Sequence, residues 1–240
     1  MNWFSNWFNS PYYHTLYKNR DKKEAQFFIN NLIQYLQVPK GSKLIDIACG
    51  RGRHAIYFNK KGMNVVGVDL SKNSIATAKQ FENSFLMFDV HDMREVYKEN
   101  HFDIATNLFT SFGYFDNEND NLKAITAISK NLKAEGLLII DFMNEKQVIT
   151  NLLYSEQKTI DGIVFNINRK VEEGRIIKDI AITDGTEKQQ FQEKVKALTL
   201  ADFSNFISKA GLKIIDIFGN YKLDDFNATT SDRLILICKK

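Results

Sequence analysis

Residues 44–54 read LIDIACGRGRH, and this stretch decides how the chain folds. A short apolar strand runs directly into a turn that contains Gly50 and Gly52. Glycine has no Cβ atom, so the backbone can turn tightly there and a ligand can approach it closely. A second apolar strand, residues 65–69 (VVGVD), ends on Asp69 about 17 residues after the turn, where a carboxylate can accept hydrogen bonds from two ribose hydroxyls. Together the two strands predict a site for an adenosine-type cofactor at the edge of a parallel sheet.

The glycine pattern by itself leaves the cofactor open. The spacing Gly50-x-Gly52-x-x-Ala55 also fits the fingerprint of dinucleotide-binding enzymes, which makes an NAD(P)-dependent oxidoreductase one interpretation. Asp46 favours another, because it lies in the strand immediately before the turn, where a dinucleotide site would have to receive a pyrophosphate. A carboxylate repels phosphate there and attracts an ammonium or sulfonium group. S-adenosylmethionine (SAM) carries both of those cations and no phosphate, so Asp46 indicates SAM.

Five segments between about residues 40 and 145 occur in an order that is typical of one enzyme family. They are Asp46-x-Ala48-Cys49-Gly50-x-Gly52, then residues 68–71 (VDLS), 88–93 (FDVHDM), 102–107 (FDIATN) and 136–141 (GLLIID). In this order they resemble the motifs of class I SAM-dependent methyltransferases, although the family usually has glycine where this chain has Ala48. Residues 48–54, 91–94 and 107–115 are similar to those of a bacterial, small-molecule-type branch, which implies a fold and a cofactor but no particular acceptor.

The resemblance implies a set of cofactor contacts. Asp46 faces the methionine ammonium, Asp69 takes the ribose hydroxyls, and Asp92 accepts from the adenine amino group. Further contacts come from the turn and from the ends of later strands, at Ala48, Cys49, Gly50, Gly52, Leu70, Met93, Asn107 and Leu108. Without the family resemblance, Asp69 is interpreted as a charge at a helix N-terminus and Asp92 as an ordinary acidic residue of a loop. We interpret Cys49 as a small packing residue rather than a nucleophile.

Aromatic residues after the fourth predicted strand indicate an acceptor pocket. Phe109, Phe112 and Tyr114 follow that strand at its carboxyl end, beside the switch point where ligands of such sheets bind. We predict that these three side chains bind the substrate. The alternative is that they only anchor the helix that follows.

The N-terminal residues 1–20 are too aromatic for a free tail. We predict that they form a lid, with Tyr13 and Tyr17 touching SAM or the substrate, and the alternative is a helix packed on the flank of the domain. Methyl transfer mainly requires that the acceptor be held close and collinear, so the chemistry demands no fixed catalytic residue. The catalytic base is therefore unassigned, with His14, Tyr17 and Asp141 as candidates.

The composition is that of an ordinary globular protein. The chain has 240 residues, of which 44% are hydrophobic and 25% charged, and a formal net charge of +3. This charge is small and scattered, so we expect no binding of nucleic acid. We find no signal-peptide pattern, no membrane span and no metal-ligand spacing, and we expect a cytoplasmic protein with two reduced cysteines, Cys49 and Cys238.

Strands and helices alternate over most of the chain, beginning with a helix whose start is marked by Asp21-x-x-Glu24. This predicts an α/β, Rossmann-like, doubly wound sheet that is mostly parallel, and the family resemblance implies an antiparallel last strand between two others. From about residue 155, period-two patterns with turns at Glu173-Gly174 and Asp184-Gly185 predict an antiparallel meander of three runs. We expect a SAM-binding domain of residues 21–156 and 199–240. Residues 157–198 are then an insertion that serves as a substrate lid or as the interface of a homodimer.

The sequence thus predicts a SAM-dependent methyltransferase that moves a methyl group to a small-molecule acceptor by in-line displacement. An enclosed pocket fits a small acceptor better than a polymer. An NAD(P)-dependent oxidoreductase and a non-catalytic SAM-binding protein are the alternatives.

Overall fold

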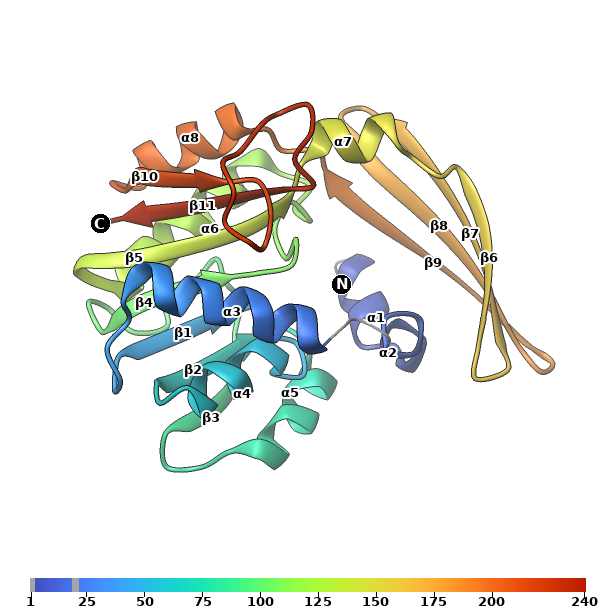
Figure 1. The fold of residues 1–240 in the computed structure, drawn as a ribbon. Coiled ribbons are helices and arrows are strands. Elements are labelled where there is room, and N and C mark those ends of the chain that lie inside the picture. Colours follow the sequence, from blue (N-terminus) through green and yellow to red (C-terminus); the bar gives the residue numbers. More distant parts are fainter. Residues whose placement is uncertain (1–2, 19–21) are drawn as a thin grey trace.

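A seven-stranded sheet forms the centre of the protein in the computed structural model, which describes residues 3–18 and 22–240 (Figure 1). From edge to edge its strands are β10 (Lys213–Phe218), β11 (Arg233–Lys239), β5 (Leu132–Met143), β4 (Phe102–Asn107), β1 (Lys43–Ile47), β2 (Asn64–Asp69) and β3 (Leu86–Val90). Strands β1 to β5 are parallel to their neighbours in this group, and β11 is antiparallel to both β5 and β10. The predicted doubly wound sheet, with an antiparallel last strand between two others, is confirmed.

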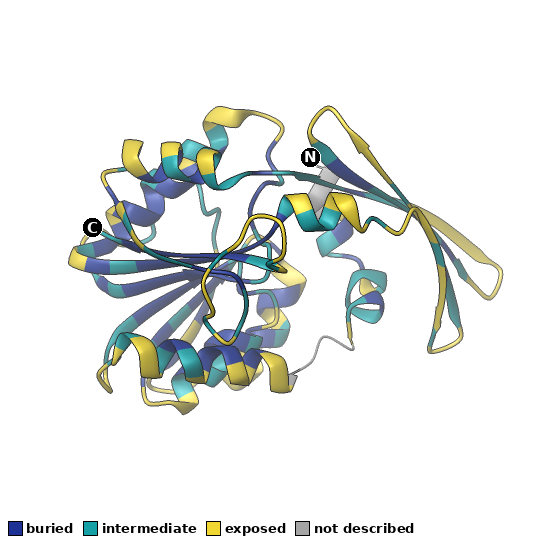
Figure 2. Cartoon of the chain, turned by 45° about the horizontal axis from the view of Figure 1, so that its top comes forward, coloured by how far each residue is buried: buried dark blue, intermediate teal, exposed yellow. Residues whose placement is uncertain are grey.

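Helices cover both faces of this sheet. One layer consists of α3 (Lys22–Leu36), α4 (Arg53–Lys60), α5 (Lys72–Ala78) and the short 3₁₀ helix η1 (Lys79–Phe81), and the other of α6 (Glu118–Asn131) and α8 (Leu200–Lys209). The strands between these layers are largely buried (Figure 2), which explains why their sequences are nearly continuous apolar runs. Local signals define where the helices begin: the Ser71 side chain accepts the N–H of Ser74, and Thr199 forms a capping box with Asp202.

The register of the parallel strands brings the two cofactor motifs together. Ile47, at the end of β1, lies opposite Val68, which immediately precedes Asp69. Strand β1 pairs with β2 on one side and with β4 on the other, so the order of the strands reverses there. Because ligands of doubly wound sheets bind at the carboxyl edge beside such a reversal, the turn after β1 and the segment after β4 border one site.

A second, antiparallel sheet stands apart from the first (Figure 1). After α7 (Glu145–Thr150) it contains β6 (Ser155–Ile160), β7 (Ile163–Glu172), β8 (Arg175–Asp184) and β9 (Glu187–Lys196). The predicted antiparallel insertion is confirmed, but it has four strands rather than three. The sequence pattern misses β6 because its residues, SEQKTI, are mostly polar and carry no alternating apolar side chains. A tight turn at Asp161-Gly162, with φ values of +53° and +81°, joins it to β7.

Two short N-terminal helices, α1 (Trp3–Phe8) and α2 (Pro11–Leu16), lie between the two sheets (Figures 1 and 2). Trp7 and Leu16 are buried in the apolar cluster of the second sheet. On the opposite side, the Ser71 hydroxyl at the start of α5 donates to Oδ1 of Asn9 over 2.7 Å. The apolar face of the insertion is therefore covered by these helices. Asp21, the first residue of the predicted capping box, lies outside the described residues.

Candidate active site

A cavity of about 670 Å³ lies at the carboxyl edge of the seven-stranded sheet. Of the predicted cofactor residues, Ala48, Cys49, Gly50, Asp69, Leu70, Asp92, Met93, Leu108, Tyr13 and Tyr17 line it. The predicted substrate residues Phe109, Phe112 and Tyr114 line it as well. Residues after β1 to β4 thus face residues of α1 and α2 across one space. In the described part of the chain, no residue of β6 to β9 lines the cavity.

The turn after β1 gives the cavity a wall made of backbone. Gly50 has a φ of +57°, and a Cβ atom placed on it would meet no other atom within 4 Å. Its N–H donates to Asp69 Oδ2 over 2.8 Å, and the N–H of Ser71 donates to Oδ1 over 2.7 Å. Burial raises the pKa of Asp69, and these two hydrogen bonds oppose the rise. Each carboxylate oxygen keeps a second lone pair that can accept a ligand hydroxyl.

Gly52 has a different role from Gly50. A Cβ atom there would lie 2.6 Å from the ring of Phe88 in β3, and Gly52 is not among the described residues that line the cavity. Its small size therefore serves the packing of the turn against the sheet. Asn107, another predicted contact, donates from its side chain to the carbonyl of Ile47 over 3.2 Å and also lies off the cavity wall.

Asp46 is buried beneath the turn, with 1% of its surface exposed. Its Oδ1 accepts a hydrogen bond from the Thr106 hydroxyl over 2.8 Å, and its Oδ2 has no hydrogen-bond partner among the described residues. Burial raises the pKa of Asp46 to about 7, although the bond from Thr106 opposes the rise. Asp46 is not among the described residues that line the cavity. Its charge would therefore act on a cation in the cavity from beneath the turn, without direct contact.

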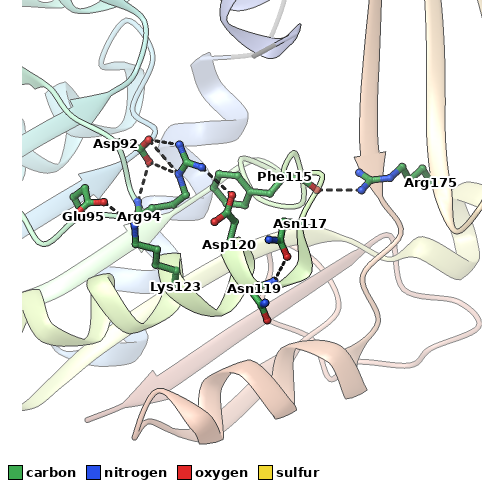
Figure 3. Close-up of polar contacts among 9 residues, drawn as sticks. All are labelled: Asp92, Arg94, Glu95, Phe115, Asn117, Asn119, Asp120, Lys123 and Arg175. Atoms are coloured by element: carbon green, nitrogen blue, oxygen red, sulfur yellow. Dashed lines mark hydrogen bonds and ion pairs between the residues drawn. The ribbon is translucent and has the colours of Figure 1, made fainter. Parts of the chain in front are cut away.

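Asp92 is bound by Arg94, which lies two residues further along the same segment (Figure 3). Arg94 donates to it four times: the backbone N–H and Nε to Oδ1, and Nε and Nη2 to Oδ2, with the shortest contact at 2.6 Å. Its Nη1 also reaches Asp120 Oδ2 over 2.8 Å, and its guanidinium lies over the ring of Phe115. Burial raises the pKa of Asp92, but Arg94 outweighs it and holds this pKa below its usual range. Asp92 therefore has little capacity left for a further hydrogen bond.

One group of residues on the cavity wall is aromatic. The ring of Phe8 stands edge-on to Tyr13 and to Tyr114, with centroid distances of 5.0 and 5.3 Å, and Tyr13 lies 5.1 Å from Tyr17. Phe112 borders the cavity but is 1% exposed, and its ring packs against helix α8. Phe109, Phe112 and Tyr114 thus border the cavity, and their binding of the substrate stays a prediction. The contact of Phe112 with α8 is not the contact with the following helix that the alternative describes.

A buried ionic cluster fixes the N-terminal helices to the second sheet. Glu193 of β9 accepts from Trp7 Nε1 at 2.6 Å, from the Tyr17 hydroxyl at 2.8 Å and from Lys178 Nζ at 2.8 Å. Burial raises the pKa of Glu193, but Lys178 and these donors outweigh it and lower the pKa overall. The Tyr17 hydroxyl therefore points toward the insertion while its ring borders the cavity. His14, also on the cavity wall, has its Nε2 3.5 Å from the Ser74 hydroxyl.

Asp141, the third candidate for a base, is placed elsewhere. It is 1% exposed, forms an ion pair with Arg233 at 2.7 Å and is absent from the described cavity lining. The N–H of Phe109 and the hydroxyl of Tyr221 both donate to its Oδ2. A carboxylate held by three donors under the cavity wall is unsuited to take a proton from an acceptor. The sequence pattern names neither Arg233 nor Tyr221, because both are far from every motif along the chain.

Comparison with known proteins identifies the family. The methyltransferase domain family matches residues 39–198, which include β1 to β9. The chain belongs to this family. It is a methyltransferase of the SAM-dependent class, as its five ordered motifs predict, and SAM is its cofactor.

Relatives support this assignment over most of the chain. A putative methyltransferase from Bacillus subtilis, YqeM, is 22% identical over 213 residues, which are 85% of this chain and 86% of the relative. A SAM-dependent methyltransferase from Clostridium acetobutylicum has the same fold, with a TM-score of 0.80, 21% identity and 95% of each chain covered. CalS10, an amino pentose methyltransferase of Micromonospora echinaspora solved with SAM bound, matches with a TM-score of 0.71 and 17% identity over 96% of this chain and 97% of its own.

Two features are absent from the described residues. These residues contain no group of three or more His, Cys, Asp or Glu side chains placed to hold a metal ion. None of the helices over the same ranges has the length and apolar character needed to cross a membrane.

Proposed function

We propose that this methyltransferase moves a methyl group from SAM to a small-molecule acceptor enclosed between the sheet edge and the N-terminal helices. One observation carries the proposal: a single cavity is lined both by the Gly50 turn with the Asp69 carboxylate and by a group of aromatic rings. The open space above Gly50 and the free lone pairs of Asp69 fit a nucleoside with ribose hydroxyls.

We assign the cofactor contacts accordingly. Asp69 accepts the ribose hydroxyls, the Gly50 backbone lies against the methionine part, and Leu70, which is 41% exposed beside the cavity, covers the adenine face. The charge of Asp46 beneath the turn attracts the methionine ammonium. Arg94 already donates hydrogen bonds to the Asp92 carboxylate. We therefore assign the adenine amino group to Asp92 as an acceptor that it shares with Arg94, and we assign the main polar contact of adenine to the Met93 backbone.

When bound, SAM supplies a methyl group on a positively charged sulfur, which is a good leaving group. The chain then has to hold the acceptor atom in line with that bond and to exclude water. Phe8, Tyr13 and Tyr114 are suited to both tasks because their rings lie in mutual contact at the cavity wall. His14 is the side chain that we assign to proton removal where the acceptor carries a proton, because it borders the cavity near Ser74.

The class of acceptor draws support from the names of relatives. A glycine/sarcosine N-methyltransferase from Aphanothece halophytica is 31% identical over 52% of this chain, and an N,N-dimethyltransferase of a dTDP-amino sugar from Streptomyces venezuelae is 25% identical over 44%. Both act on small amines by their names. We therefore propose a small amine as the first acceptor to test. The methyl group would move to its nitrogen by in-line displacement.

We also propose that the insertion does not itself cover the cavity but supports the N-terminal helices that do. Helices α1 and α2 border the cavity, whereas the second sheet contacts these helices from behind. The sheet then supports the lid rather than closing the pocket itself. Because the apolar face of the sheet is covered by α1 and α2 within the same chain, dimerisation through that face is disfavoured.

The test has two stages. Calorimetry with S-adenosylhomocysteine and, separately, with NAD and NADP should show binding of the first compound alone, and binding of a dinucleotide instead would overturn the cofactor assignment. Tritiated SAM is then incubated with glycine, sarcosine, a dTDP-amino sugar and a matched sugar nucleotide without an amino group. Transfer to one or more of the amines and not to the matched control supports the proposal. Binding of S-adenosylhomocysteine with no transfer to any member of the panel favours a non-catalytic SAM-binding protein or another acceptor class.

A further inference from the structure

The segment that follows β4 has a backbone conformation that its side chains disfavour. Phe109 and Thr110 have φ values of +63° and +57°, and both line the cavity. This left-handed region is open to glycine, uncommon for other residues and an outlier for β-branched residues such as threonine. Two consecutive residues persist there only when surrounding groups hold them in place.

Asp141 of β5 holds the backbone of both residues. The N–H of Phe109 donates to Asp141 Oδ2 over 2.8 Å, and the N–H of Thr110 donates to the Asp141 carbonyl oxygen over 2.9 Å. The Tyr221 hydroxyl donates to the same Oδ2 over 3.0 Å. The strained segment is thus fixed by one buried residue of the neighbouring strand.

Arg233 of β11 holds the side chains. Its Nε donates to Asp141 Oδ1 over 2.8 Å, and its Nη2 donates to Thr110 Oγ1 over 3.0 Å. The guanidinium also lies 5.9 Å from the centroid of the Phe109 ring. The planar guanidinium group can serve all three partners at once, which a lysine ammonium cannot do in this geometry.

We propose that Asp141 and Arg233 are positioning residues for methyl transfer. As an ion pair behind the cavity wall, they keep Phe109 and Thr110 in the left-handed conformation and so make this segment a rigid wall for the acceptor. The proposal rests on the proposed function, since it places this segment on the acceptor side. Neither residue of the pair is among the described residues that line the cavity, so both act through the segment and not on the reacting atoms.

The test uses Arg233→Lys, which keeps the positive charge, and Asp141→Asn, which keeps the shape. In each variant, hydrogen–deuterium exchange of the amides of residues 108–111 should become at least tenfold faster, while the Kd for S-adenosylhomocysteine stays within threefold of the wild-type value. Thr110→Val is a milder variant that preserves the β-branched shape and removes the hydroxyl that Arg233 reaches, and it should accelerate exchange less. Where an amine of the panel is methylated, kcat should fall at least tenfold with little change in the KM for SAM.

An ion pair between β4 and β5, at the opposite end of these strands, provides the control. Lys133 of β5 lies 2.6 Å from Asp103 of β4, at the edge of the sheet away from the cavity. Asp103→Asn should leave exchange at residues 108–111 and kcat unchanged.

If amide exchange at residues 108–111 is unchanged in Arg233→Lys, Asp141→Asn and Thr110→Val, the positioning role is overturned. A parallel loss of protection across the whole sheet would overturn it as well, because that result indicates a purely structural ion pair. If the wild-type protein fails to bind S-adenosylhomocysteine, the proposed function fails instead, and the exchange result still decides whether the pair holds the segment.

Discussion

Two groups of residues build the cavity in different ways. The group that we assign to the cofactor comes from a short piece of chain, residues 46–52, joined by Asp69 from the adjacent strand, and it presents largely backbone groups. The group that we assign to the acceptor consists of side chains of α1, α2 and the segment after β4, which are supported by Glu193 of the insertion and Arg233 of β11. A change in the first group should therefore affect cofactor affinity, whereas a change in the second should affect the acceptor or the lid and leave cofactor affinity almost unaltered.

The largest effect is expected for Gly50→Val. A branched side chain would enter the open space above the turn, so the affinity for S-adenosylhomocysteine should fall by at least about 100-fold, which corresponds to roughly 2.7 kcal/mol. Calorimetry measures the change. Gly211→Val is the matched control, because Gly211 also has a positive φ, +75°, and no atom within 4 Å of a Cβ, yet it lies at the end of α8. Equal loss of affinity in both variants would show that backbone strain, and not the cavity, is responsible.

The next effect concerns Asp69. Replacing it with alanine removes the acceptor for two ribose hydroxyls and frees the N–H groups of Gly50 and Ser71, so binding should weaken by about 1–3 kcal/mol. Asp69→Asn retains one acceptor oxygen and should lose less. The affinity of S-adenosylhomocysteine and of its 2′-deoxy analogue is measured for each variant. If the wild-type protein binds both ligands equally, the ribose assignment of Asp69 is wrong.

A smaller and pH-dependent effect is expected at Asp46. Burial raises its pKa to about 7 in the folded protein, above the value near 4 of an unfolded chain, so ionisation costs stability. The cofactor-free protein should lose stability as pH rises from about 4 through 7, and Asp46→Asn should flatten this slope in urea unfolding. Cofactor affinity should change in the opposite sense, rising about tenfold, or roughly 1.4 kcal/mol, between pH 6 and 8 as the carboxylate becomes charged. An affinity that is independent of pH in the wild-type protein would remove Asp46 from the ammonium site.

The smallest effect on cofactor affinity is expected for Glu193→Ala. This change removes the acceptor shared by Trp7, Tyr17 and Lys178 and leaves the partly buried Lys178 without its ion-pair partner, so the N-terminal helices should loosen. Amide exchange in residues 6–17 should become faster, while S-adenosylhomocysteine binding stays within about threefold of the wild type, less than 1 kcal/mol. Glu187→Ala, an exposed change on the same strand, is the control. A loss of affinity comparable with that of Asp69→Ala would mean that the lid is part of the cofactor site.

The difference between local backbone features and side chains that come from distant elements explains which residues could be predicted from the sequence. The turn after β1 and the end of β2 are local features, and the spacing of glycine and aspartate along the chain carries enough information to place Gly50 and Asp69. The same spacing does not show that Gly52 packs against Phe88, because that contact depends on how β3 pairs with β2. The polar strand β6 and the partners Glu193 and Arg233 carry no local signal that marks them.

The doubly wound fold, the family and the cofactor could be predicted from the sequence, since hydrophobic periodicity and motif order depend on short-range geometry. Tertiary packing, in contrast, decided that the N-terminal helices separate the insertion from the cavity. It also decided that Asp141 lies behind the wall with Arg233. These arrangements join residues as many as 186 positions apart, such as Trp7 and Glu193, and only the packing of distant elements against one another brings such side chains within hydrogen-bonding distance.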